Sequence, residues 1–197
     1  ITRVSGNAPY LAWATVNDAG SGDGSLVAPF PEGTLPGLTT VVIPGAVQSS
    51  RYTTELVATN PAAIPVSVRV TLTGTGTTLT ETLAAGATMY IPDLFEELRR
   101  RGLPGAPAAG VPTLTPLVVN TPYVGIRVSS RSSAGLSFGV FEAAVGVYQE
   151  TFSVVVPDLR QDDRTRTNLG FLNGSPNPMT CRIDVTDGDS GRLVATR

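Results

Sequence analysis

The feature that most constrains this chain is an internal repeat, in which positions match at a constant offset of 113 in the numbering. The best stretch joins residues 51–60 to residues 164–173, where arginine, threonine, leucine and asparagine positions coincide. The offset holds without a gap from Pro9 to Thr73, which indicates that the chain contains an internal duplication. Other matched pairs are Asn7 with Asn120, Tyr10 with Tyr123, Val41 with Val154, Val42 with Val155, Pro65 with Pro178 and Arg69 with Arg182.

The phase of the repeat divides the chain unevenly. Residues 41–153 make one complete copy, residues 1–40 match the end of that copy, and residues 154–197 match its beginning. The two ends together lack the counterpart of residues 85–113. We therefore expect a complete domain at 41–153 and a second, split domain that combines 1–40 with 154–197.

Within the complete copy, alternation of apolar and polar residues predicts short β-strands. Val66, Val68, Val70 and Leu72 alternate with polar residues, which gives a strand with one buried face. Similar strands are expected at 41–46, 51–59, 77–83, 86–91, 115–120, 123–129 and 136–142. Short strands at this spacing are typical of an immunoglobulin-like β-sandwich, so the predicted fold class is all-β, with two such units related by the repeat.

One short helix is predicted near residues 93–101. Asp93 is followed three positions later by Glu96, which is the pattern of a capping box. The other helix signals are the apolar stripe of Leu94, Phe95 and Leu98 and the terminal Gly102. The arginines at 99–101 fall in the last turn, where positive charge suits the helix dipole and glutamates lie four residues back. This local role explains the cationic run better than a nucleic-acid patch does.

Three absences from the composition exclude much catalytic chemistry. The chain has no His and no Lys, and it has one Cys. Without His there is no Ser-His-Asp or Cys-His nucleophile system and no imidazole metal ligand, and without Lys there is no Schiff base. We therefore expect no catalytic residue and no cofactor, and the chain is predicted not to be an enzyme. An acid–base carboxylate pair of the glycosidase type is the alternative left open, although spacing singles out no pair.

The charge of the chain gives no basis for two classes of partner. A net charge of -2 offers no cluster of cations for a phosphate backbone or an anionic membrane surface. No apolar run reaches the roughly 18 residues that a membrane span requires. We expect neither nucleic-acid binding nor membrane insertion.

A group of sequence motifs extends over nearly the whole chain. The motifs are residues 52–61, 66–72, 83–88, 93–95, 159–162 and 166–171. Together they resemble a tandem domain of large secreted bacterial surface proteins. The resemblance implies paired immunoglobulin-like domains outside the cell, and it implies no catalytic residue. One departure is that the family completes a unit beginning like 154–197 downstream, whereas here the matching tail is in residues 1–40.

Two acidic loops, residues 17–25 and 184–191, raise the question of calcium binding. Calcium takes several oxygen ligands from closely spaced Asp, Asn and Ser. The counterparts of these loops in the repeat, residues 130–138 and 71–78, contain no carboxylate. We interpret Asp and Gly in both loops as shaping hairpin turns and expect no metal site, with weak calcium binding as the alternative.

Two single residues are candidates for a special role. Trp13 is a candidate sugar-stacking platform, but its counterpart is Ile126, a core residue type, so packing is expected. Cys181 aligns with Val68 in the alternating strand and is expected to be a small buried hydrophobe rather than a nucleophile.

The sequence supports two functional hypotheses. The leading one is a non-catalytic structural or assembly module of an extracellular surface protein, fibre or filament, because repeated domains are commonly spacers. The alternative is a binding module for carbohydrate or another ligand, appended to a secreted enzyme. Exposed aromatic residues lining one sheet face would favour this alternative.

The split domain predicts how the chain associates. Alone, residues 1–40 or 154–197 would expose sheet edges and an apolar face, which template pairing with other strands. The two ends meet either in cis, giving a compact two-domain monomer, or in trans, giving a head-to-tail ring or filament. Both routes stay open, and the expected partners are other copies or neighbouring domains of the same protein.

Overall fold

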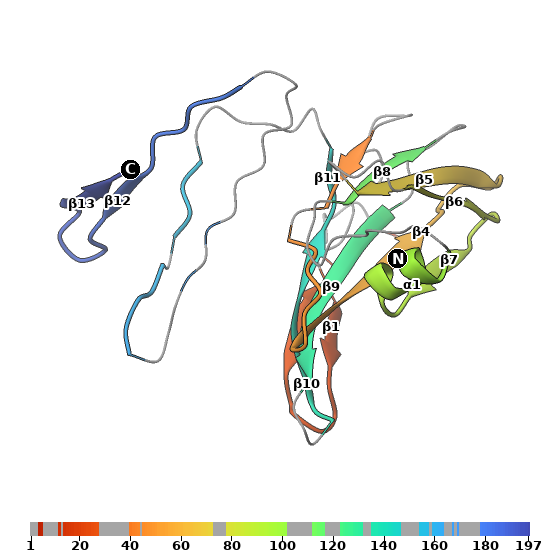
Figure 1. Cartoon of the computed structure of the whole chain (residues 1–197), viewed down its shortest axis with the longest axis horizontal. Coiled ribbons are helices and arrows are strands. Elements are labelled where there is room, and N and C mark those ends of the chain that lie inside the picture. Colours follow the sequence, from red (N-terminus) through yellow and green to blue (C-terminus); the bar gives the residue numbers. More distant parts are fainter. Residues whose placement is uncertain are drawn as a thin grey trace. The chain divides into compact units, whose positions relative to one another are not determined.

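The computed structural model (Figure 1) is rich in β-strands, with one helix among the described residues. The chain divides into two compact units, Ile1–Gln149 and Glu150–Arg197, each of which is described by itself. The structure describes residues 4–5, 12, 14–27, 40–43, 45–72, 78–101, 112–116, 123–131, 135–146, 154–157, 159–163, 167, 169 and 178–197.

The first unit contains two larger antiparallel sheets. One has four strands in the order β10 (Ser137–Ala143), β9 (Tyr123–Arg131), β4 (Tyr52–Thr59) and β7 (Thr88–Ile91). The other has five strands in the order β11 (Val145–Gly146), β3 (Val41–Val42), β8 (Pro112–Pro116), β5 (Val66–Leu72) and β6 (Thr78–Leu83).

Both sheets contribute to one apolar cluster. In β5, every second side chain from Val66 to Leu72 is buried, as the period-two pattern predicts. In β4 of the other sheet, Leu56 and Ala58 are buried in the same cluster, as is Ile126 of β9. Full burial of a side chain such as Val or Leu contributes about 1.5–3 kcal/mol, so this shared core is what holds the two sheets together.

The predicted helix is α1 (Leu94–Arg100), and it closes part of this core. Its apolar stripe, Leu94, Phe95 and Leu98, is buried. The side chain of Asp93 caps the helix by accepting a hydrogen bond from the amide of Glu96 at 2.9 Å. The carboxylate of Glu96 pairs with an arginine of the last turn, so the structure shows one half of the predicted capping box.

Two of the ion pairs on α1 join residues three apart rather than the predicted four. Arg99 pairs with Glu96, and Arg100 pairs with Glu97, in each case three residues apart at 2.7 Å. Arg101 pairs with Glu97 at the predicted spacing of four residues. The predicted end at Gly102 lies outside the described residues.

The predicted strands match the structure closely where it describes them. Those expected at 51–59, 77–83, 123–129 and 136–142 correspond to β4, β6, β9 and β10 with shifts of one or two residues. The strand expected at 41–46 is shorter, because Gly45 turns the chain with a positive φ of 83°. Of the strand expected at 115–120, residues 117–120 lie outside the described residues, and β8 begins earlier, at Pro112.

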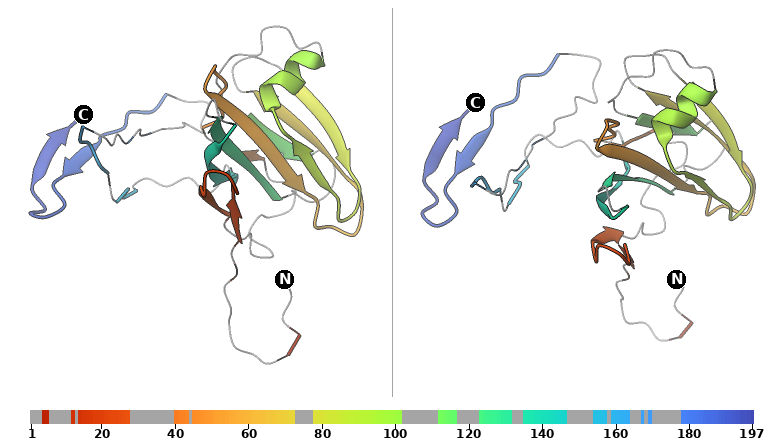
Figure 2. Two further views of the ribbon diagram at one scale, coloured as in Figure 1. Left: turned by 90° about the horizontal axis from the view of Figure 1, so that it is seen from below. Right: turned by 60° about the horizontal axis from the view of Figure 1, so that its bottom comes forward.

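A hairpin formed by β1 (Ala14–Asn17) and β2 (Gly24–Val27) also belongs to the first unit. It lies beside β9 and β10 (Figure 2), and β2 contacts β10. The β1–β2 hairpin therefore packs on β10, which lies within residues 41–153.

The second unit contains one described hairpin, formed by β12 (Asp184–Thr186) and β13 (Leu193–Thr196) with an irregularity after Val185. Residues 164–173, which match residues 51–60 in the repeat, are expected to superpose on them, but apart from 167 and 169 they lie outside the described residues. In the part of the chain that the structure describes, no helix has the length and apolar character to cross a membrane.

Candidate functional site

The first acidic loop forms the turn between β1 and β2. Asp18 Oδ1 accepts hydrogen bonds from the backbone amides of Gly20 at 3.0 Å and Ser21 at 2.7 Å. Gly22 has a φ of 71°, and the amide of Asp18 closes the turn by donating to the carbonyl of Asp23 at 2.9 Å. The amide of Ser21 makes the largest contribution to a pKa of Asp18 below its ordinary value.

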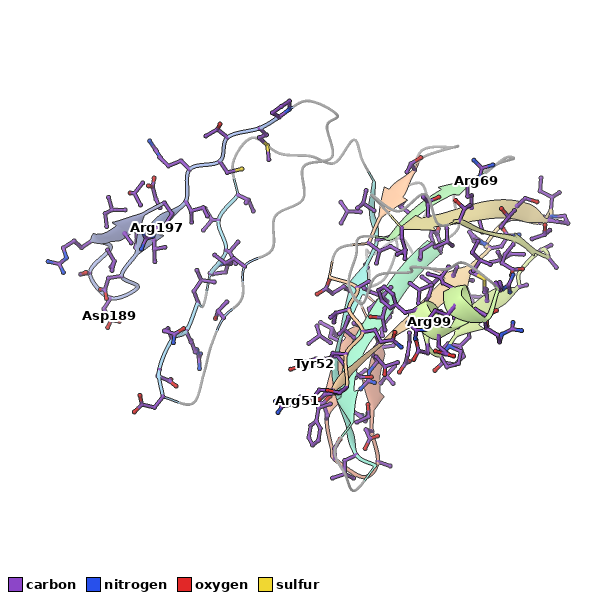
Figure 3. The ribbon with its side chains drawn as sticks, in the orientation of Figure 1. Arg51, Tyr52, Arg69, Arg99, Asp189 and Arg197 are labelled. Carbon is purple, nitrogen blue, oxygen red and sulfur yellow. The ribbon has the colours of Figure 1, made fainter. Side chains whose placement is uncertain are left out.

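The second acidic loop forms the same turn between β12 and β13. Asp187 Oδ1 accepts hydrogen bonds from the hydroxyl of Ser190 at 2.6 Å and from its amide at 2.8 Å, and the hydroxyl leads in lowering the pKa of Asp187. Gly191 has a φ of 67°, and the amide of Asp187 donates to the carbonyl of Arg192. Asp189 stands at the tip of this hairpin (Figure 3).

Both carboxylates are therefore used to shape turns. The loop between β9 and β10 supports this interpretation, because Gly135, the counterpart of Gly22 in the repeat, also has a positive φ, of 79°. Among the described residues, no group of three or more His, Cys, Asp or Glu could hold a metal ion.

Among the described residues, a polar cluster surrounds Arg127 of β9, a residue that the sequence did not single out. Its guanidinium is 11% exposed and lies 3.5 Å from Glu55 Oε1 and 3.7 Å from Asp23 Oδ2. It also donates to Ser25 Oγ at 3.1 Å and to Ser137 Oγ at 2.9 Å. Arg127 thus joins the β1–β2 hairpin to strands β4, β9 and β10.

Alternate side chains of the hairpin bind the backbone of β10. Ser21 Oγ donates to the carbonyl of Ser137, and Ser25 Oγ donates to the carbonyl of Gly139, both at 2.8 Å. The amide of Gly139 donates to Asp23 Oδ2 at 2.7 Å. Since β10 is the edge of its sheet in the described structure, these side chains occupy backbone groups that another strand could otherwise pair with.

The prediction that Cys181 is buried is wrong for this structure. Cys181 is exposed, whereas its counterpart Val68 is fully buried between the two sheets of the first unit. Alternation indicates which face of a strand is apolar, but burial requires a second layer on that face. The described part of the second unit consists of one hairpin and neighbouring segments, and it does not cover Cys181.

Among the described residues, the exposed aromatic side chains do not line one sheet face. Tyr52 of β4 and Phe138 of β10 both pair with Ser130 of β9, so they share a face. Tyr90 of β7 points to the other face, because its neighbour Ile91 is buried. Figure 3 shows Tyr52 pointing away from its sheet. Trp13, the candidate sugar platform, lies outside the described residues, although its counterpart Ile126 is buried as expected.

A cavity of about 510 Å³ lies beside α1, between the edge strands β6 and β7. Arg101 on its rim bridges Glu81 at 2.5 Å and Glu97 at 2.7 Å. Hydrogen bonds from Arg100 and then Arg101 lower the pKa of Glu97 to about 2. The charged groups on the rim are thus engaged with one another, as expected of a structural ion-pair network.

No protein-family model, curated protein or solved structure matches this chain. Two features of the described residues bear on its function: the uncovered apolar positions of the second unit and the hairpin held by Arg127.

Proposed function

We propose that the chain is a non-catalytic structural or assembly module of an extracellular protein, built from tandem immunoglobulin-like sandwiches. The first unit would be a complete sandwich, and the second would be completed by further strands. The extracellular location rests on the resemblance to secreted bacterial tandem domains, and the non-catalytic character rests on the absence of His and Lys.

The observation that carries the proposal is a difference in burial between matched positions of the repeat. Val41, Val42 and Ile43 of the first unit are buried, whereas Val154, Val155 and Val156 of the second are exposed. The same contrast holds for Leu56 and Leu169, Val66 and Met179, and Val68 and Cys181. The second unit thus presents the apolar positions that form a core in the first.

The first unit indicates what kind of partner these positions need. There, β3 (Val41–Val42) lies between strands β8 and β11, and the core also receives side chains from β9. A two-stranded hairpin such as β12–β13 is marginally stable alone and gains stability when further strands cover its apolar face. Strands that resemble residues 85–153 would provide that cover, and within this sequence residues 1–40 match the later part of that range.

Completion in cis would give a compact two-domain monomer, and completion in trans would give a head-to-tail ring or filament. Either outcome is a structural function. The carbohydrate-binding alternative gains no support from the described aromatic residues, because Tyr90 lies on the opposite face from Tyr52 and Phe138.

The test is the solution mass of the full chain over a hundredfold concentration range, with Val155→Asp as the disrupting variant and Thr80→Asp as the control. Both substitutions add one negative charge at an exposed position, but Thr80 lies on β6 of the first unit. In trans, mass rises with concentration in wild type and control, and Val155→Asp abolishes the rise.

In cis, mass stays constant, and Val155→Asp makes residues 154–197 sensitive to protease while Thr80→Asp does not. The proposal is wrong if Val155→Asp changes neither mass nor protease sensitivity relative to the control.

A further inference from the structure

The β1–β2 hairpin and the β9–β10 hairpin occupy matching positions of the repeat. Residues 14–17 are the counterparts of residues 127–130 in β9, and residues 24–27 are the counterparts of residues 137–140 in β10. Both turns contain a glycine with positive φ. The structure therefore places side by side two hairpins that occupy the same position in successive copies of the repeat (Figure 2).

The chemistry of this contact is directional. The first hairpin supplies hydroxyl and carboxylate groups at alternate positions, whereas the second supplies backbone groups and a guanidinium. Positions 21, 23 and 25 are Ser, Asp and Ser, and their counterparts are Ala134, Leu136 and Phe138. The counterpart of Arg127 is Ala14. Neither hairpin can therefore take the role of the other, and the contact is heterologous.

Arg127 makes the contact strong as well as directional. Its guanidinium is largely covered and faces Asp23 from the hairpin and Glu55 from β4. Hydrogen bonds to charged groups are roughly twice as strong as those between neutral groups. Loss of the guanidinium would remove the cation that both carboxylates approach, beside the buried Ser25, which favours release of the hairpin.

The turns of the two hairpins also approach closely. A Cβ atom added at Gly20 would lie 2.7 Å from Leu136 Cδ2, which is inside van der Waals contact. The turn of the first hairpin therefore rests on the residue that follows Gly135 in the second. The contact extends from the turn to Ser25, so it restrains the turn and the start of β2.

We propose that the face of β9–β10 around Arg127 is a docking surface for the hairpin that ends a preceding repeat unit. The surface recognises a hairpin with Ser, Asp and Ser at alternate positions, here residues 21, 23 and 25, and it makes a stiff, directional joint between successive units. This inference rests on the proposed function of a tandem structural module, and it names the contact that sets the orientation of the units.

The joint is tested by double electron–electron resonance on the full chain, in a Cys181→Ser background. Spin labels at Thr15→Cys in β1 and Thr80→Cys in β6 report the position of the hairpin relative to the core of the first unit. We expect one narrow distance distribution. Arg127→Met should broaden it, and Arg99→Met, which removes an arginine from the exposed surface of α1, should leave it narrow.

A second variant guards against unfolding caused by loss of Arg127. The double variant Asp23→Ala with Ser25→Ala alters only the hairpin and leaves every residue of the two large sheets unchanged. It should broaden the distance distribution without changing the melting temperature of those sheets. The inference is overturned if the parent chain already gives a broad distribution, or if both variants leave it narrow. Neither result affects the comparison of Val155→Asp with Thr80→Asp, so the joint and the proposed function can fail separately.

Discussion

Val155 is the counterpart of Val42 in the repeat, and it is 87% exposed, whereas Val42 is 8% exposed. Both residues are valines, and in each copy the preceding residue is also a valine. What differs is that Val42 lies in β3, between neighbouring strands of a sheet that shares a core with another sheet. The difference therefore reports the absence of covering strands around Val155 among the described residues, rather than a difference in the residue itself.

Substituting each valine by aspartate should separate these environments. Val42→Asp places an unpaired charge in the core, and the expected loss in free energy of unfolding of the first unit is about 3–5 kcal/mol. Val155→Asp should leave the unfolding of the first unit unchanged. Urea denaturation followed by the fluorescence of a label placed on β6 measures both. Equal losses in the two variants would show that Val155 belongs to the core of the first unit.

Asn60 is a buried polar residue whose contribution to stability can be measured directly. Its side-chain amide donates to the carbonyls of Ile64, Leu83 and Ala84, and its oxygen accepts from the amide of Ala62. Asn60→Ala leaves these groups without that partner, so we expect a loss of about 1–3 kcal/mol in the free energy of unfolding. Thr80→Ala, at an exposed position of β6, is the control and should change the free energy of unfolding little. A similar small change at both positions would show that water replaces the Asn60 network.

The loss of folding stability at acidic pH should depend on Glu97. Its pKa is lowered from 4.5 to about 2 by hydrogen bonds from Arg100 and Arg101, so its ionised form stabilises the fold fully above pH 4.5. This contribution is lost as the pH falls from 4.5 towards 2. Glu97→Gln should therefore lower stability at neutral pH and flatten its dependence on pH in that window. Urea midpoints measured between pH 2 and pH 4.5 test this, with the substitution Glu96→Gln at a more exposed position as control. If the stability of Glu97→Gln depends on pH as steeply as that of the wild type, Glu97 is not the group responsible.

Removal of divalent metal should leave the melting temperature unchanged. Asp18 and Asp187 already accept hydrogen bonds within their own turns, so neither carboxylate needs a bound cation to hold it in place. Differential scanning calorimetry with and without a chelator provides the measurement. A fall of several degrees that added calcium reverses would show that the acidic loops bind the ion in the folded state.

Much of the first unit could be predicted from sequence because its elements have local signals. The alternation of Val66 to Leu72, the apolar stripe of α1 and the cap at Asp93 each depend on residues within one element. The order of strands in the two sheets depends on pairing between distant segments, such as β4 with β9. Periodicity does not specify such pairing.

The contact around Arg127 shows the same limit at a single residue. Alternation places Arg127 on the polar face of its strand, and from sequence such a residue is expected to face water. Its partner Ser25 is 102 residues away, and no local pattern connects them. Two signals were nevertheless present: the counterpart of Arg127 is Ala14, and the loop assigned to a turn carries Ser21, Asp23 and Ser25 at alternate positions.

The central claim, that the apolar face of the second unit is completed by other strands, is tested most directly through Cys181. As the only cysteine, it reports one position, and its counterpart Val68 is fully buried. The rate of maleimide labelling should be measured across protein concentration, with the urea-unfolded chain as the fast limit and Val68→Cys in a Cys181→Ser background as the buried reference. The account predicts that labelling of Cys181 slows towards the buried reference, at every concentration for completion in cis and with rising concentration for completion in trans. Labelling as fast as in the unfolded chain at every concentration would contradict it.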